Sequence, residues 1–159
     1  MPRLQRTSLM SGLTDRTIPQ TAQKREAGFW KLFREAMKKR AKARKLNWTR
    51  LETWAMPGVP DIVIQDASGN FHFIELKHTG SNAVDLRPHQ VSWLSKHSHG
   101  SVWVLVRQQR TNMDDPKLLL FAGGDAVQLK MEGLTKVEPL FECDSPFNWD
   151  AVLDLICPT

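Results

Sequence analysis

The sequence has only two cysteines and no long run of apolar residues. Cys143 and Cys157 form no CxxC pair, and no histidine pair at zinc-binding spacing accompanies them, so neither a disulfide framework nor a structural zinc site is indicated. The longest apolar runs span a few residues, and the N-terminus has no apolar core before a small-residue cleavage site. We therefore expect no membrane span and no signal peptide, and a protein of the reducing cytoplasm.

Length and composition indicate one folded domain. The chain has 159 residues, of which 41% are hydrophobic and 25% are charged. These fractions are ordinary for a globular protein and exclude a fibrous or wholly disordered chain. Residues 1–20 mix Arg, Ser, Thr, Gly and Pro with little periodicity, which indicates a flexible basic arm. We expect residues 21–159 to form a single domain.

Positive charge is concentrated in one segment. Residues 22–50 contain eleven basic and two acidic residues, a net charge of +9, whereas residues 51–159 contain eight basic and fourteen acidic residues, a net charge of −6. A local positive field attracts polyanions such as nucleic acids. The alternative is a solvated helix face rich in lysine. The candidate nucleic-acid-binding residues of this segment are Lys38, Lys39, Arg40, Lys42, Arg44, Lys45 and Arg50.

Hydrophobic periodicity predicts a chain of mixed helices and strands. Within residues 21–45, Phe29, Phe33 and Met37 recur at four-residue steps, as in an amphipathic helix. Residues 101–107 are apolar throughout, which indicates a central strand covered on both faces. The other expected elements are strands at 47–55, 61–65, 71–77 and 118–122, helices at 88–97 and 147–156, a turn or helix at 124–129 and an extended piece at 136–141.

Three chemically distinct side chains meet in the predicted hairpin of residues 61–77. Side chains alternate along a strand, so Glu75 and Lys77 point to one side while Leu76 points into the core. The turn at residues 66–70 brings Asp61, at the mouth of its own strand, next to them. The structural alternative is an exposed Glu75–Lys77 pair and an aspartate that only forms a turn.

Two carboxylates placed in this way suit Mg²⁺ or Mn²⁺, because such a hard cation is held by one or two protein oxygens, water and substrate phosphate. The backbone carbonyl of Leu76 can add a further ligand. A metal ion so bound lowers the pKa of a water molecule and clamps the oxygens of a phosphodiester. Lys77 would then orient the water or offset the charge that develops at the phosphate.

The segment Gly58-Val59-Pro60-Asp61, the tight hairpin and the segment Ile74-Glu75-Leu76-Lys77 together resemble the site motif of the PD-(D/E)XK nuclease superfamily. The match is closest to its VRR-NUC and phage Holliday-junction-resolvase-like branch. The resemblance covers residues 26–107, about half of the chain. It implies an α/β fold with a restriction-endonuclease-like core, in which helices flank a mixed central β-sheet.

The resemblance also implies a glutamate from the first helix. Glu26-Ala27-Gly28-Phe29-Trp30 is similar to the family's helical Glu-x-x-Phe-Trp element, whose glutamate joins the metal cluster. At 100° per residue Glu26 falls within about 60° of Phe29 and Phe33, whereas Glu35 falls on the opposite side. An acid on the buried face needs a partner, which a metal cluster would provide. The alternative is a first-turn glutamate favoured by the helix dipole.

Two further segments are similar to family elements. Arg50-Leu51-Glu52 resembles an Arg-Ile-Glu segment, in which Arg50 would meet a phosphate, although an ion pair between Arg50 and Glu52 is an equal alternative. The segment from Leu86 to Trp93 resembles a Leu-(Arg/Ser)-Pro-x-Gln-x-x-Trp helix. Gln90 would then position substrate or water and Arg87 would contact DNA; the alternative is helix capping and packing by Trp93.

The family relationship implies a Mg²⁺- or Mn²⁺-dependent endonuclease that acts on branched DNA such as a Holliday junction. Resolvases of this kind make two paired cuts, so a homodimer is implied, and a phage-encoded protein would work in the host cytoplasm. The alternatives are a nuclease for flaps, nicked or single-stranded DNA in phage DNA degradation or repair, and a non-catalytic DNA-binding accessory protein with the same fold. His78 is expected in a loop, and residues 108–159 contain no motif that can be interpreted.

Overall fold

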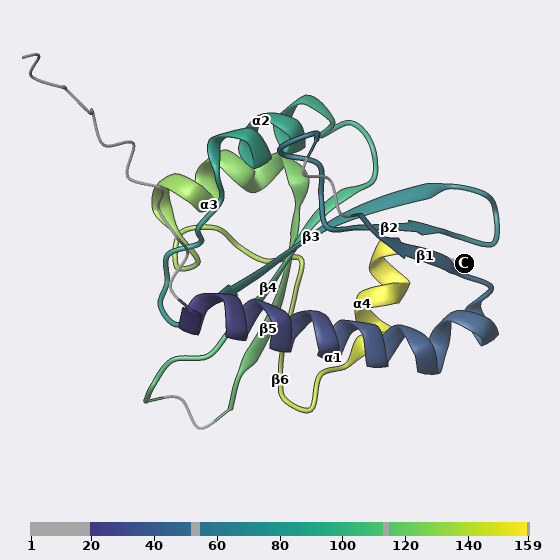
Figure 1. The fold of residues 1–159 in the computed structure, drawn as a ribbon, viewed down its shortest axis with the longest axis horizontal. Helices are drawn as coiled ribbons and strands as arrows, with labels where there is room; N and C mark the ends of the chain where they lie inside the picture. Colours follow the sequence, from purple (N-terminus) through teal and green to yellow (C-terminus); the bar gives the residue numbers. More distant parts are fainter. Residues whose placement is uncertain (1–19, 52–54, 113–114, 159) are drawn as a thin grey trace, which may run out of the picture.

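The structure is a computed structural model that describes residues 20–51, 55–112 and 115–158. Helices lie on both sides of one central sheet (Figure 1). Within the described residues the elements are, in chain order, α1 (Gln20–Arg44), β1 (Asn47–Arg50), β2 (Ile62–Gln65), β3 (Phe71–Thr79), α2 (Pro88–Lys96), β4 (Val102–Gln108), β5 (Lys117–Ala122), the 3-10 turn η1 (Gly123–Asp125), α3 (Ala126–Glu132), β6 (Phe141–Asp144) and α4 (Trp149–Ile156).

The described strands form a six-stranded sheet whose spatial order follows the sequence, from β1 to β6. Only the central pair, β3 and β4, is parallel among these strands, and α2 makes the crossover between them. The other neighbours are antiparallel. The predicted α/β fold with a mixed central sheet flanked by helices is therefore confirmed.

One face of the sheet is covered by α1 and α4. Phe29, Phe33 and Met37 repeat at four-residue steps along α1 and are fully buried against the sheet. From α4, Val152 and Ile156 pack into the same core. The sheet residues of this core are Ile62, Ile64, Ile74, Leu105, Leu118 and Leu120.

The opposite face is covered by α2 and α3. Leu94 of α2 and Leu129 of α3 are fully buried there, against Val102, Val104 and Phe121 of the sheet. Successive residues of a strand point to opposite faces, so β4, with Val104 on one side and Leu105 on the other, is apolar from Val102 to Val106. This confirms the prediction of a central strand covered on both faces.

A short turn joins β2 to β3. The Asp66 carboxylate accepts hydrogen bonds from the backbone N–H groups of Ser68 and Asn70 at 2.9 and 3.0 Å, and Gly69 takes a positive φ of 87°. The same carboxylate lies 2.8 Å from Nε2 of His72, a buried residue near the start of β3. These contacts fix the register Ile62↔Ile74 of the hairpin.

Two expectations about local structure are wrong. The extended piece expected at residues 136–141 lies later, as β6 over Phe141–Asp144. His78 is not in a loop, because β3 continues to Thr79. Both errors have the same cause. The position of β6 depends on its pairing with β5, and the end of β3 depends on its pairing with β4, and the local sequence pattern does not reveal such pairing. In the described residues no helix is long and apolar enough to pass through a bilayer.

Candidate active site

Glu75 and Lys77 share one face of β3, the face covered by α2. Their neighbours in the parallel strand β4 are Val104 and Val106, which belong to the core under α2 and α3. Both charged side chains are buried, with exposed side-chain fractions of 1% for Glu75 and 9% for Lys77, and Nζ of Lys77 lies 3.4 Å from Oε1 of Glu75. The exposed-pair alternative is therefore wrong, because the two side chains are buried and in contact.

Asp61 is fixed beside this pair by backbone contacts on two sides. It precedes β2, and extending the register Ile62↔Ile74 by one residue sets Asp61 opposite Glu75. Its Oδ2 accepts a hydrogen bond of 2.8 Å from the N–H of Leu76, and its carbonyl oxygen accepts one of 2.7 Å from the N–H of Leu51. Its carboxylate thus lies against the strand segment that contains Glu75 and Lys77.

Gln90 connects α2 to this cluster. Its Nε2 donates a hydrogen bond of 2.6 Å to Oε1 of Glu75. Its Oε1 accepts one of 2.9 Å from the N–H of Arg87 at the start of α2. Gln90 thus takes part in the helix cap and contacts Glu75 of the candidate site. Its role in positioning substrate or water stays a prediction. Arg87 itself is exposed at the N-terminal end of α2.

Gly58 allows the segment before Asp61 to approach α2 closely. Its φ is 95°, and a Cβ atom at this position would lie 2.3 Å from the carbonyl oxygen of His89. Only glycine combines this backbone conformation with such a short approach to another backbone. The glycine of the Gly-Val-Pro-Asp motif therefore holds the Asp61 segment against the turn of α2 that carries Gln90.

Burial disfavours the ionised form of both carboxyl groups. Burial first, and then the neighbouring Asp61 charge, raises the pKa of Glu75 to about 8, against the opposing effect of Lys77. Burial likewise raises the pKa of Asp61, against the hydrogen bond from Leu76 and the charges of Lys77 and Arg50. A bound cation would favour both charged forms.

The donor set fits a hard divalent cation. Oε2 of Glu75 is buried and has no hydrogen-bond partner among the described residues, although its Oε1 is fully engaged. Buried carboxylate oxygens are otherwise paired, so this atom is suited to a metal ion. Asp61, Glu75 and the Leu76 carbonyl would hold it. Among the described residues no group of three His, Cys, Asp or Glu side chains gathers at one point, so the expected three-acid cluster is not formed.

The prediction that Glu26 lies on the buried face of the first helix is wrong. Glu26 is exposed, and the buried face of α1 begins only at Phe29. The helical wheel gave the correct direction for Glu26 around the helix axis. The first turns of α1, however, extend beyond the sheet that covers the rest of the helix. Glu26 still lies near enough for its charge to raise the pKa of Glu75, as a contribution smaller than those of burial, Asp61 and Lys77.

Arg50 lies at the end of β1, with its guanidinium 4.6 Å from the ring centroid of Trp30. This stacking is a cation–π contact, and the Arg50 side chain remains partly open to solvent. Its charge helps to keep the pKa of Asp61 down. Glu52, its alternative ion-pair partner, lies outside the described residues.

Acidic side chains of α4 pair with two of the arginines on the basic face of α1. Arg44 contacts Asp154 at 2.8 Å and Asp150 at 3.0 Å, and Arg40 contacts Asp150 at 3.2 Å. These two arginines therefore have carboxylate partners within the fold. The exposed lysines of the same helix and its end are Lys24, Lys31, Lys38, Lys39, Lys42 and Lys45.

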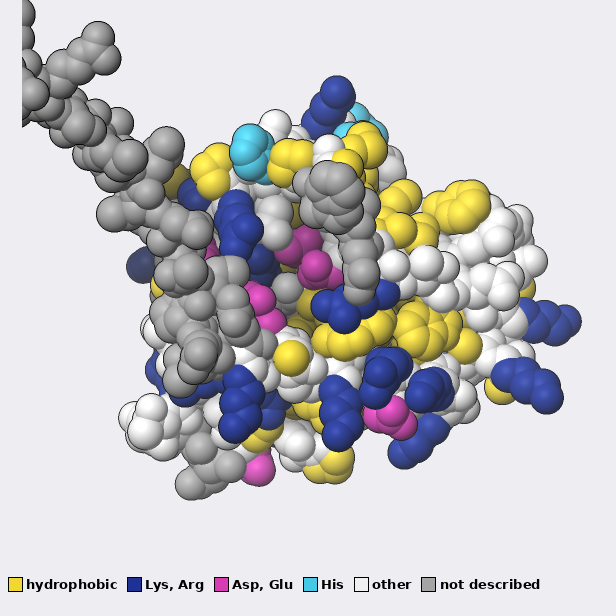
Figure 2. Space-filling view, in the orientation of Figure 1, with side chains coloured by type: hydrophobic (Ala, Val, Ile, Leu, Met, Phe, Trp, Pro, Cys, Tyr) yellow, Lys and Arg dark blue, Asp and Glu magenta, His cyan; other side chains and the backbone are white. Residues whose placement is uncertain are grey.

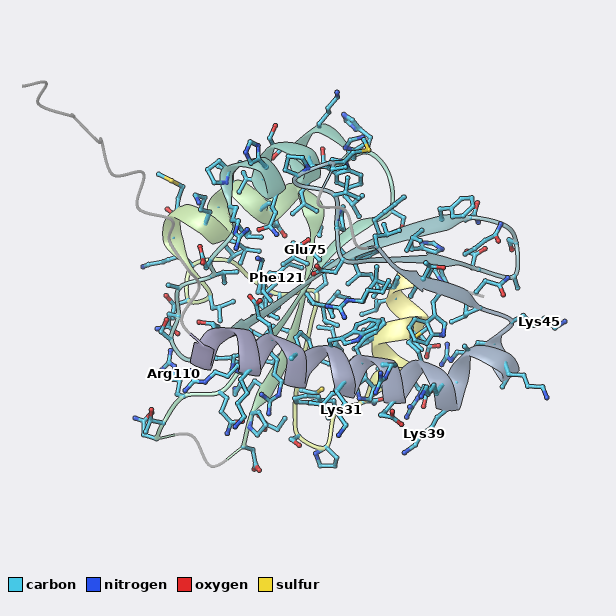
Figure 3. The ribbon with its side chains drawn as sticks, viewed as in Figure 1. Lys31, Lys39, Lys45, Glu75, Arg110 and Phe121 are labelled. Carbon is cyan, nitrogen blue, oxygen red and sulfur yellow. The ribbon has the colours of Figure 1, made fainter. Side chains whose placement is uncertain are left out.

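The acidic and basic groups lie on one side of the molecule. Figure 2 shows acidic side chains between the layer of α1 and that of α2, with lysine and arginine side chains along α1. In Figure 3, Glu75 lies on β3, while Lys31, Lys39 and Lys45 lie along α1.

The structure also groups basic residues that sequence reasoning missed. Arg25, Arg107 and Arg110 lie around a common cavity with His78. Arg25 of α1 is more than eighty residues from Arg107 and Arg110 in sequence. The parallel pairing of β3 with β4 sets Arg107 beside His78, and α1 brings Arg25 to the same cavity. No local spacing could have identified the group.

No protein-family model matches this chain, and no curated protein matches it. Among solved structures it is similar to Hjc, a Holliday junction resolvase from the archaeal hyperthermophile Archaeoglobus fulgidus, with 19% sequence identity and a TM-score of 0.41. The similar region covers 74% of this chain and 88% of the resolvase. At this distance the chemistry of the present chain has to be derived from its own residues.

Proposed function

We propose that this protein is a Mg²⁺- or Mn²⁺-dependent endonuclease of the PD-(D/E)XK superfamily that hydrolyses phosphodiester bonds in branched or otherwise structured DNA. The observation that carries the proposal is the buried cluster of Asp61, Glu75 and Lys77, in which one carboxylate oxygen of Glu75 has no partner among the described residues. Such a cluster is costly to fold unless a ligand completes it.

Each residue has a separate role in the proposed reaction. Asp61, Glu75 and the Leu76 carbonyl would hold the cation, which when bound supplies a more acidic water molecule and offsets charge on the phosphate. Lys77 projects from the same face as Glu75 and would donate to the water or to a phosphate oxygen. Gln90 holds Oε1 of Glu75, which leaves Oε2 for the cation. Glu26 would act on the site through its charge.

The exposed lysines of α1 support DNA as the substrate. Lys38, Lys39, Lys42 and Lys45 would contact backbone phosphates, which gives affinity without base specificity. Arg50 and Arg87, at the ends of β1 and α2 nearest the carboxylates, would meet phosphates closer to the cut. A homodimer would supply the two sites that paired cuts in a junction require.

Cleavage of defined DNA substrates tests the proposal. Wild-type protein with Mn²⁺ should cut a four-way junction in preference to a flap or linear duplex, and it should be inactive with EDTA. Asp61→Asn should abolish cleavage and keep most of the DNA affinity, because the lysines of α1 are separate from the carboxylates. Preference for the flap would favour the repair alternative. Absence of all cleavage by wild-type protein would leave a DNA-binding accessory protein.

A further inference from the structure

A cavity of about 350 Å³ lies beside the candidate active site, where the first turns of α1 meet the ends of β3 and β4. We refer to it as the arginine cavity. Figure 3 shows Arg110 next to the N-terminal end of α1, at the opposite end of this helix from Lys45. The residues that line the cavity are Arg25, His78, Arg107, Gln109, Arg110 and Thr111.

The arginines of the cavity are held by neutral groups. Arg107 lies 3.3 Å from Nδ1 of His78 through one terminal nitrogen and donates a 3.0 Å hydrogen bond to Oε1 of Gln109 through the other. Arg110 donates to the side-chain oxygen of Asn82. Arg25 reaches the backbone at Gly80, where a Cβ atom would lie 3.1 Å from its guanidinium. Arg107 and Arg110 are thus positioned before any ligand binds, whereas the side chain of Arg25 is exposed.

Three positive charges therefore converge without a counter-charge. Among the residues that the structure describes, no acidic side chain lines the cavity. The Nε atoms of Arg107 and Arg110 are buried and have no hydrogen-bond partner there. Buried cations are normally paired with an anion, and burial alone lowers the pKa of Arg107. The unused donors indicate an anionic ligand that accepts several hydrogen bonds.

The cavity is coupled to the candidate active site through neighbouring residues. Lys77 and His78 are consecutive on β3, so their side chains lie on opposite faces at the same end of the strand. Arg25 and Glu26 are consecutive on α1: Arg25 lines the cavity and Glu26 acts on Glu75. The cavity and the candidate active site therefore lie at the same end of β3.

We propose that the arginine cavity binds a phosphate group of the DNA substrate, near but distinct from the phosphate that is cut. Arginine is the side chain best suited to this ligand, because its planar guanidinium makes two parallel hydrogen bonds to phosphate oxygens. The inference rests on the proposed nuclease function for the identity of the substrate. The phosphate is either an internal one of the strand or a terminal 5′-phosphate, and both present the same oxygens.

Direct titration with inorganic phosphate tests the cavity without requiring catalysis. In the full-length protein, saturable shifts of the NMR signals of the Arg107 and Arg110 side chains are expected. Arg25→Gln and Arg110→Gln should each weaken this binding about tenfold, as for loss of one hydrogen-bonding group to a charged ligand. Lys96→Gln is the matched control, because it removes one exposed positive charge from the last turn of α2. Absence of saturable binding, or equal binding by all variants, would overturn the proposal.

The salt dependence of DNA binding tests whether the phosphate belongs to DNA. In an Asp61→Asn background, Arg25→Gln and Arg110→Gln should each lower the slope of log affinity against log salt by about 1 more than Lys96→Gln does. Junctions with 5′-phosphate and with 5′-hydroxyl ends separate the two sources. A loss on both junctions identifies an internal phosphate, and a loss only on the phosphorylated one identifies a terminal phosphate.

The two experiments also separate this inference from the proposed function. If wild-type protein cleaves DNA but the slopes of the two arginine variants equal that of Lys96→Gln on both junctions, the cavity does not bind the substrate and the inference is wrong. If no DNA is cleaved but phosphate binding and the slope change are observed, the nuclease proposal fails and the phosphate site stands. Circular dichroism and thermal unfolding of each variant verify that the fold is retained.

Discussion

The side-chain amide of Gln90 donates a 2.6 Å hydrogen bond to Oε1 of Glu75 while its oxygen accepts from the N–H of Arg87. The two contacts fix which end of the amide faces the carboxylate, because the helix cap requires the oxygen. One residue thereby links the start of α2 to the candidate metal ligand. Loss of this link defines the first prediction.

Replacement of Gln90 should impair the site more than the fold. Gln90→Ala leaves Oε1 of Glu75 without its donor, and such supporting contacts of metal ligands are typically worth about 10- to 100-fold in metal affinity or activity. Mn²⁺ affinity and kcat on a four-way junction measure the effect. Ser92→Ala, at an exposed position of α2, is the control and should change neither quantity. Equal Mn²⁺ affinity in wild type and Gln90→Ala would show that Gln90 has no role in positioning Glu75.

Cation binding should release a proton below about pH 8. The pKa of Glu75 is raised to about 8, chiefly by burial, so the carboxyl is protonated at neutral pH and must ionise to hold a cation. Mn²⁺ affinity should therefore increase from pH 6 to pH 8 and then level off. Calorimetry in buffers of different ionisation enthalpy measures the released proton. An affinity that is constant over this range contradicts the assignment of Glu75.

The same shift predicts the pH dependence of stability without metal. A raised pKa in the folded state means that protonated Glu75 favours folding at low pH, and that this contribution is lost as the pH rises from about 4.5 to about 8. Glu75→Gln does not titrate, so its unfolding free energy should exceed that of wild type increasingly across this window. Each unit of pKa shift corresponds to about 1.4 kcal/mol. Urea unfolding in EDTA at pH 5 and pH 8 tests the sign.

Gly58→Ala should lower both stability and cleavage. The added Cβ would lie 2.3 Å from the carbonyl oxygen of His89 at a φ of 95°, so the Asp61 segment must move away from α2. We expect a loss of roughly 1–3 kcal/mol in unfolding free energy. Gly28→Ala is the matched control, because its Cβ would meet no atom within 4 Å and alanine is the better helix residue. A neutral Gly58→Ala would contradict the close approach.

Removal of the acids of α4 should strengthen DNA binding. Asp150 and Asp154 pair with Arg40 and Arg44, so Asp150→Asn with Asp154→Asn would release two arginines of α1 for phosphates. The slope of log affinity against log salt should become steeper by about 1 to 2. The control pair is Asp125→Asn with Glu132→Gln, at the two ends of α3, which removes the same charge elsewhere and should have a smaller effect on the slope. If both pairs of substitutions act equally, the effect is one of net charge.

The hairpin that carries the candidate site was predictable because its signals are local. Three signals lie within twenty residues of each other: the apolar strand after Asp61, the turn composition at residues 66–70 and the alternation of side-chain direction along β3. They predicted that Glu75 and Lys77 share a face and that Asp61 lies beside them. Burial of this pair was not predictable, since it depends on α2 covering that face.

Features that depend on distant contacts were missed or misplaced. Periodicity identified α1 but not the residue at which the sheet stops covering it, so Glu26 was expected to be buried. The basic segment was identified by its composition, but the partners of Arg40 and Arg44 lie more than a hundred residues away in α4. Arg110 lies in a region without a motif, and the placement of Arg107 and Arg110 beside Arg25 depends on the packing of α1 in the fold.

The order of the strands in the sheet has a consequence for synthesis on the ribosome. Since each strand pairs with the one made just before it, the growing chain can assemble the sheet from one edge to the other without waiting for a distant partner. Every candidate ligand of the cation has been synthesised once the chain reaches Leu76. The strand β4, the parallel neighbour of β3, is complete at Gln108. Helix α4 packs on the same face as α1 and follows every described strand in the chain, so the part of this core that includes Phe33 stays uncovered until Trp149 and the rest of α4 have been made.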